Sequence, residues 1–148
     1  MRNFTLPIKK FFWFLLLFAI LMLAHVTKVM AQATGTTTWT GNSTNWNSNA
    51  SWTNGVPNST TTAIINGTAI TDPEITGSVS CYDLIIQNGS VTITSPNSQL
   101  TVHGSVQIKS GATLVNEGLL LVVRGNFVND GDYSEILYKY RGSNYFPA

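Results

Sequence analysis

Paired carboxylates are the first side chains in this sequence that could do chemistry. Asp130 and Asp132 are separated by a single residue, Gly131. A glycosidase needs two carboxylates about 5–10 Å apart across a bound sugar, and this pair could provide them on one strand. Asn129 and Gly131 flank the pair, however, and this composition favours a turn in which Asp side chains bond the backbone. We therefore predict a chain that is not an enzyme, with a polysaccharide-degrading or carbohydrate-binding module as the alternative.

Three basic residues occupy similar places in the sequence. His103, Arg124 and Arg141 each follow an apolar or aromatic residue and directly precede a glycine. If their segments stack, the three side chains form one outward column with neighbours about 4.8 Å apart. Such a column predicts a binding site for an acidic glycan or another anion. The alternative is a solvated column screened by acids such as Glu117 or Asp130, because surface charge pairs are common and weak.

Aromatic residues form the third candidate site. Trp39, Trp46 and Trp52 lie 7 and 6 residues apart among Thr, Asn, Ser and Gly. Each indole carries about 150–250 Å² of surface that favours burial, so the three rings predict an end cap on an apolar core. Exposed rings would instead form a platform on which sugars stack.

Metal and cofactor sites are not predicted. The Asp130 and Asp132 pair lacks the repeated Gly-Gly-x-Gly-x-Asp spacing of calcium-binding rolls. Cys81 is the single cysteine, so no internal disulfide can form. A small buried side chain is the expected role of Cys81, and a reactive or intermolecular thiol is the alternative.

Repeated short strands must position these residues. Segment 84–89 matches 106–111 at an offset of 22 residues, 100–105 matches 121–126 at 21, and 138–143 is a weaker copy at 17. Self-similarity at just over twenty residues is typical of a solenoid of stacked coils. Apolar residues two apart alternate with Thr and Gln, which separates an inner from an outer face. We expect an all-β fold, a short right-handed parallel β-helix of about three turns with an irregular Trp-rich N-terminal cap.

One strand breaks this alternation. Residues 119–123 are apolar at every position. A strand that is apolar on both faces is usually covered on both. The segment therefore predicts a strand whose outer face is covered by another segment or chain.

The first 31 residues have the features of a signal peptide. Arg2, Lys9 and Lys10 precede an apolar run from Phe11 to Ala24. A membrane-spanning helix needs about 20 apolar residues, so this run fits a signal-peptide helix better than an anchor. We expect cleavage after Ala31 and no membrane association afterwards, with an uncleaved signal anchor as the alternative.

Removal of the leader changes the charge of the chain. Residues 1–31 hold four of the eight Lys and Arg and none of the seven Asp and Glu, so the net charge goes from +1 to 4 − 7 = −3. Nucleic-acid binding needs clustered basic residues, so this partner is not expected. The remaining Thr, Ser, Asn and Gly suit a secreted or cell-surface β-protein with many turns.

Two groups of motifs resemble large secreted bacterial surface proteins of the adhesin type. The first is the cap motif Trp39-Thr40-Gly41, Asn45-Trp46-Asn47, Ser51-Trp52, Gly55-Val56-Pro57, followed by Ala63-Ile64-Ile65. The second is the set of rung motifs Cys81-Tyr82-Asp83-Leu84-Ile85-Ile86, Gly111-Ala112-Thr113-Leu114 and Asn116-Glu117-Gly118. The resemblance covers about residues 38–131 and implies a Trp-rich cap followed by parallel β-helix rungs. It also implies a non-catalytic structural or adhesive role, with extracellular glycans or further rungs of a longer protein as partners.

The expected organisation has three parts. Residues 1–31 are the signal peptide, 32–62 the Trp-rich cap, and 63–148 the β-helix rungs. Because proteins of this type continue through many more rungs, we expect the rungs to be truncated at the C-terminus.

Overall fold

The computed structural model describes residues 32–135, 138–141 and 144–147. The expected signal-peptide helix lies outside these residues. Within them the fold is nearly all β, and its parallel strands form a β-solenoid of about three turns, which confirms the predicted fold class. The strands are β1 (Gly35–Thr38), β2 (Thr61–Asn66), β3 (Glu74–Ile75), β4 (Ser78–Cys81), β5 (Leu84–Ile93), β6 (Gln99–Val102), β7 (Val106–Ile108), β8 (Ala112–Asn116), β9 (Leu119–Val122), β10 (Phe127–Asn129), β11 (Asp132–Glu135), β12 (Tyr138–Arg141) and β13 (Asn144–Pro147).

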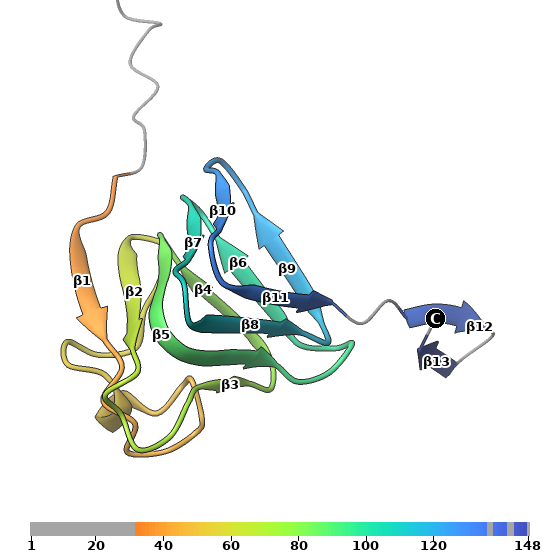
Figure 1. Cartoon of the computed structure of the whole chain (residues 1–148), viewed down its shortest axis with the longest axis horizontal. Coiled ribbons are helices and arrows are strands. Elements are labelled where there is room, and N and C mark those ends of the chain that lie inside the picture. The colour runs from red at the N-terminus through yellow and green to blue at the C-terminus, as the bar shows by residue number, and fades with distance from the viewer. Residues whose placement is uncertain (1–31, 136–137, 142–143, 148) are drawn as a thin grey trace, which may run out of the picture. The chain divides into compact units, whose positions relative to one another are not determined.

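Three parallel ladders run along the solenoid (Figure 1). Ladder 1 stacks β1, β2, the first half of β5, β7 and β10. Ladder 2 stacks β3, the second half of β5, β8 and β11. Ladder 3 stacks β4, β6 and β9. Coil 1 therefore runs from β2 to β4, coil 2 from β5 to β6, and coil 3 from β7 to β9, and a fourth coil begins with β10 and β11.

Glycines turn the chain from ladder 1 to ladder 2. Gly67, Gly89 and Gly111 have φ angles of +69°, +80° and +83°, and they lie at this corner of coils 1, 2 and 3. L-residues with a side chain rarely adopt this left-handed conformation. The register pairs Leu84 with Val106 at the predicted offset of 22, so a corner that requires glycine explains this repeat.

The register of ladder 3 shows that the predicted alignment of residues 100–105 with 121–126 was wrong by one residue. Leu100 pairs with Leu120 and Val102 with Val122, an offset of 20 instead of 21. A slip of one residue moves every side chain to the opposite face of a strand. Leu120 and Val122 therefore pack against the core, whereas Leu119, Leu121 and Val123 point outward with 51%, 45% and 45% of their surface exposed. In the described residues the outer face of β9 is thus open, although the sequence predicts a covered strand.

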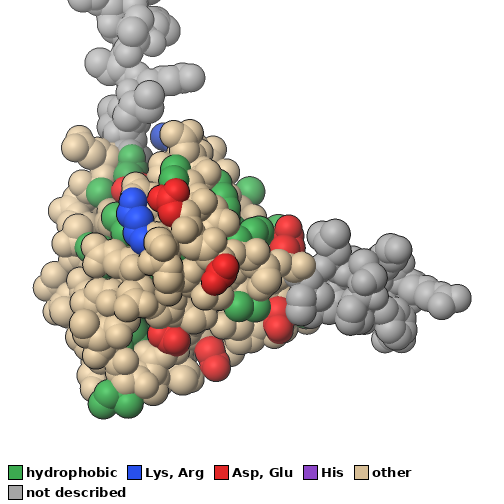
Figure 2. Space-filling view, in the orientation of Figure 1, with side chains coloured by type: hydrophobic (Ala, Val, Ile, Leu, Met, Phe, Trp, Pro, Cys, Tyr) green, Lys and Arg blue, Asp and Glu red, His purple; other side chains and the backbone are tan. Residues whose placement is uncertain are grey.

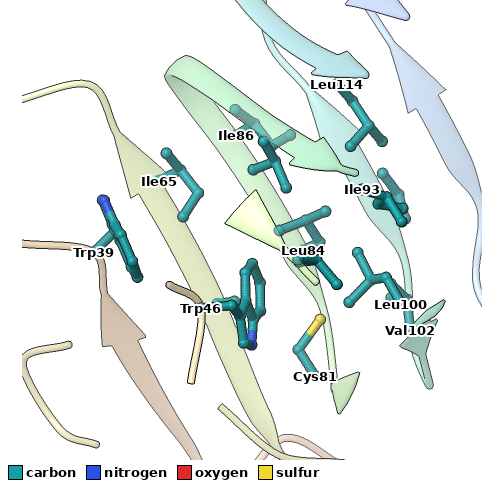
Figure 3. Packing of buried hydrophobic residues seen from close by; sticks show 14 of the residues in the cluster. Trp39, Trp46, Ile65, Cys81, Leu84, Ile86, Ile93, Leu100, Val102 and Leu114 are labelled. Carbon is teal, nitrogen blue, oxygen red and sulfur yellow. The ribbon is translucent and has the colours of Figure 1, made fainter. Parts of the chain in front are cut away.

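Inward side chains stack in columns along the solenoid. Leu84 lies over Ala63 and under Val106, and Val91 lies under Leu114. All five side chains are fully buried. Figure 3 shows how the buried residues of successive coils meet in one continuous core. Because each coil covers the apolar face of the one before it, the stack is held mainly by contacts between neighbouring coils.

The corner between ladders 2 and 3 varies in length. It has two residues in coil 1 (76–77), five in coil 2 (94–98) and two in coil 3 (117–118). The longer corner folds back on itself, because Ser98 N donates to the Ser95 carbonyl at 2.9 Å and the two hydroxyls lie 3.0 Å apart. Ser98 is buried as a result.

The chain near each end differs from the sequence-based expectation. Residues 32–62, expected to be irregular, contain the strand β1 and a short 3-10 helix at Asn49–Ser51. The weak third repeat copy at 138–143 begins with β12, which pairs antiparallel with β13 in a two-stranded sheet. Within the described ranges, no helix is long and apolar enough to span a membrane.

Candidate functional site

Three tryptophans pack together at the N-terminal end of the solenoid. The ring of Trp52 lies 4.9 Å from the rings of both Trp39 and Trp46, with interplanar angles of 77° and 68°. These edge-to-face arrangements are favourable for aromatic pairs. The three side chains retain only 4%, 1% and 0% of their exposed surface, respectively. Trp39 and Trp46 are drawn beside Ile65 and Leu84 in Figure 3.

Hydrogen bonds fix two of the three indoles. Trp52 Nε1 donates to the carbonyl of Trp46 at 2.8 Å, and Trp39 Nε1 donates to the carbonyl of Thr71 at 2.6 Å. Trp46 Nε1 is buried without a hydrogen-bond partner among the described residues. The cluster therefore combines two satisfied indoles with one that contributes through packing alone.

The Trp-rich cap is built as an incomplete coil. β1 extends ladder 1 beneath β2, and an isolated parallel bridge joins Asn45 to Glu74 of ladder 2. Trp46 N donates to the Glu74 carbonyl at 3.1 Å, and Glu74 N donates to the Thr44 carbonyl at 2.6 Å. The tryptophans thus cover the first coil from a backbone that continues its ladders, and their burial leaves no exposed indole face for a sugar.

The predicted basic column is not assembled. The register of ladder 3 places Arg124 opposite Gly104 instead of His103, consistent with the 3.0 Å hydrogen bond from Gly125 N to the Gly104 carbonyl. His103 is half-buried and Arg124 is exposed. Arg141 lies in β12 and pairs with Asn144 of β13. In the described residues these three positions therefore do not share one place in successive coils.

Acidic side chains do not form a cluster around the candidate pair. Asp130 and Asp132 are exposed, and Asp132 starts β11. The predicted turn is present, but Asn129 makes it, because its Oδ1 accepts a hydrogen bond from Gly131 N at 3.1 Å. On the face shown in Figure 2, acidic side chains are spread over the surface. Among the described residues, no group of three or more His, Cys, Asp or Glu could hold a metal ion.

Asp83 has a role that the sequence analysis missed. It lies between β4 and β5, where the chain turns from ladder 3 to ladder 1. Its Oδ1 accepts a hydrogen bond from Ser105 N at 2.7 Å, and its Oδ2 accepts one from the Thr62 hydroxyl at 3.4 Å. One carboxylate therefore joins three successive coils. The only sequence signal is its place directly before the repeated strand at Leu84.

Cys81 lies inside the core of ladder 3. Its side chain is fully buried, and it pairs in register with Val102. Burial raises the pKa of the Cys81 thiol well above its usual value, and the nearby charge of Asp83 adds to the effect. A thiol that stays protonated is a poor nucleophile, so the geometry supports the expected packing role.

The fold and the cap define the class of protein. The chain is a parallel β-solenoid whose first coil is covered by a cluster of buried tryptophans. A family described as "Domain of unknown function (DUF8693)" matches residues 38–140, and the chain belongs to this family. The match includes residues 38–62 of the Trp-rich cap, all three coils and most of β12. Comparisons with curated proteins and with solved structures gave no match.

Proposed function

We propose that this chain is a non-catalytic structural or adhesive segment of a secreted or cell-surface bacterial protein. The observation that carries the proposal is the burial of Trp39, Trp46 and Trp52, which are at most 4% exposed. Exposed aromatic rings beside paired carboxylates would support a carbohydrate-active module. Buried rings support a scaffold whose Trp motifs serve its own packing.

The outer faces of the first two coils also support a structural or adhesive role. On ladder 3 they carry Ser78 and Ser80 in coil 1 and Gln99 and Thr101 in coil 2. Short hydroxyl and amide side chains on a regular sheet offer many weak hydrogen bonds without a defined pocket. Such a surface suits contact with other matrix or surface molecules over a broad area.

The proposed location depends on the leader. A positive start, a short apolar run and the residues Val29 and Ala31 before the cleavage point support export through a signal peptide. N-terminal sequencing of the exported protein is expected to start at Gln32. Retention of Met1 in the exported protein would argue for a signal anchor.

Deletion and complementation in the producing cells test the function. Cells lacking the gene are expected to adhere less to solid surfaces or to one another, and the wild-type gene should restore adhesion. A variant with Asp130→Asn and Asp132→Asn should restore it equally, since the proposal gives the carboxylates no catalytic role. Loss of restoration in this variant, together with turnover of a polysaccharide by the wild type alone, would favour the enzyme alternative.

Trp46→Ala serves as the folding control in the same assay. It removes a fully buried ring from the cap and should fail to restore adhesion. If this variant unfolds in solution and still restores adhesion, the stacked fold is not needed and the proposal is wrong.

A further inference from the structure

The fourth coil of the solenoid lacks one strand in ladder 3. β10 pairs with β7 in ladder 1, and β11 pairs with β8 in ladder 2. β9, from the same coil, pairs only with β6 among the described strands. Its other edge, and the inward residues Leu120 and Val122 beside it, therefore have no further strand above them in the described part of the chain.

The spacing along the chain identifies the segment that fits this place. β4 follows β3 after two residues, and β9 follows β8 after two residues. β12 follows β11 after two residues as well. The strands β4, β6 and β9 are each four residues long, and so is β12. β12 thus begins at the position, and has the length, of a ladder 3 strand.

We propose that β12 adds in parallel to the free edge of β9 and completes the fourth coil, while β13 covers the outer edge of β12. The antiparallel pairing of β12 with β13 is compatible with this arrangement, since a strand has two edges. Unpaired strand edges at the end of a solenoid promote association with other chains. In the proposed arrangement β12 occupies the free edge of β9, and β13, which runs antiparallel to β12, becomes the last strand of ladder 3.

The register follows from the neighbouring ladder. Asn116 pairs with Glu135, an offset of 19. Corners of equal length carry this offset into ladder 3, which sets Tyr138 beside Leu119 and Tyr140 beside Leu121. Leu119 and Leu121 are the outward, half-exposed residues of β9. Aromatic and aliphatic neighbours on the same face of a sheet pack favourably, so this register gives the open apolar face of β9 a partner within the chain. The same register sets Lys139 over inward Leu120 and Arg141 over inward Val122. No described strand lies above this last coil, so the long aliphatic stems cover both side chains while the charges stay in water.

A second copy of the chain is the competing occupant of this edge. A short tether gives an attached segment an effective concentration in the millimolar range, which far exceeds usual concentrations of a second chain. β12 is tethered by two residues to β11, a strand of the same coil. This tether favours the hairpin of the same chain over a second copy.

Disulfide trapping tests the pairing and its register. Cα atoms of neighbouring parallel strands lie about 4.8 Å apart, within the range of 4.4–6.8 Å that a disulfide requires. The test variant carries Leu121→Cys and Tyr140→Cys in the complete chain. The positive control carries Thr101→Cys and Leu121→Cys, which are paired in ladder 3. The register control carries Leu121→Cys and Lys139→Cys, and buried Cys81 remains unchanged in all three.

Mild oxidation followed by peptide mapping is the readout. We expect the Leu121 and Tyr140 pair to form an intrachain disulfide to within about twofold of the positive control. The Lys139 pair should form it at least about tenfold less. A disulfide found only between chains would assign the edge to a second copy and overturn the proposal. A positive control that reacts while the test pair does not, or a Lys139 pair that reacts better than the Tyr140 pair, would overturn it too.

Amide hydrogen exchange gives an independent measurement on the unmodified protein. Leu119 N and Val123 N donate to carbonyls of ladder 3 in coil 2, at Ser98 and Val102. Amides alternate in direction along a strand, so those of Leu120 and Val122 point to the free edge. We expect both to exchange at least about 100-fold slower than an open amide in dilute, monomeric protein, because β12 accepts their hydrogen bonds. Exchange at the open rate would show that the edge is unoccupied.

Discussion

The carboxylate of Asp83 and the backbone amide of Ser105 lie 2.7 Å apart and join coil 2 to coil 3. A charged acceptor makes a stronger hydrogen bond than a neutral one. The same side chain explains Gly104, since a Cβ atom at this position would overlap Asp83 Oδ1. Asp83 therefore serves as a clamp at the corner between ladder 3 and ladder 1.

Replacement of Asp83 measures the strength of this clamp. Asp83→Ala removes the acceptor for Ser105 N and for the Thr62 hydroxyl. We expect the free energy of unfolding to fall by about 1.5–3 kcal/mol, the range for hydrogen bonds to charged groups. Urea titration followed by tryptophan fluorescence gives the value. Asp83→Asn, which keeps an oxygen acceptor, should lose less, and exposed Asp130→Ala should change little. Equal stability of all three variants would contradict the clamp.

Two matched variants separate packing from hydrogen bonding in the Trp-rich cap. Trp46→Phe removes an indole nitrogen that has no partner, whereas Trp52→Phe removes one that donates at 2.8 Å. Both variants lose similar volume. The free energy of unfolding of Trp52→Phe should therefore be about 1 kcal/mol lower than that of Trp46→Phe, which is the net value of one hydrogen bond. Alanine at either position should destabilise by about 3–5 kcal/mol, as for a buried large aromatic. Stable alanine variants with altered glycan binding would instead indicate a sugar platform.

Glycine corners allow a comparison at nearly constant backbone geometry. Gly67 and Gly111 have φ angles of +69° and +83°. A Cβ at Gly111 meets open space, but one at Gly67 lies 2.8 Å from Asn88 Cβ and 3.0 Å from its backbone carbon. Gly111→Ala should lower the free energy of unfolding by about 1–2 kcal/mol through the left-handed backbone alone. Gly67→Ala should lower it further, and thermal melts of the pair are the measurement. The reverse order would show that the corner of coil 1 relaxes freely.

Cys81 gives a prediction with a defined pH dependence. Its folded-state pKa is raised by burial, so the folded protein keeps the neutral thiol at pH values where the unfolded chain ionises. The contribution of Cys81 to the free energy of unfolding is therefore fully present below the unfolded pKa of about 8.5. It falls as the pH rises above this value, because only the unfolded chain gains the charged thiolate. Alkylation by iodoacetamide at pH 9 should follow the rate of unfolding. Cys81→Ala removes the extra pH dependence, and rapid labelling of folded protein would contradict the burial.

The sequence predicts the solenoid well where glycine and apolar spacing act together. Leu84 and Gly89 repeat at Val106 and Gly111 because a buried position and a left-handed corner must recur in each coil. The alignment of Leu100 was wrong by one residue because residues 119–123 are apolar on both faces and give no alternation to fix the register. Only the stacking of Leu120 on Leu100 decides which face is inner.

The Trp-rich cap shows a similar limit. Burial of the three tryptophans follows the expectation from their size, but β1 was not predicted. Its sequence, Gly35 followed by three threonines, has no apolar alternation. It is a strand because β2 offers a free parallel edge, which is a tertiary effect. The contacts of Asp83 could not be predicted from the sequence either, since its hydrogen-bond partners lie 21 and 22 residues away along the chain.

The five-residue corner at 94–98 shows where this architecture can vary. It has three more residues than the equivalent corners of coils 1 and 3, yet Ile75 still pairs with Ile93 before it and Val79 with Leu100 after it. The core register is therefore insensitive to the length of this corner. Asn97 is its exposed residue. A foreign peptide inserted beside Asn97 would be displayed at one defined height of the stack, which makes this corner the natural position for an epitope tag or a grafted binding loop.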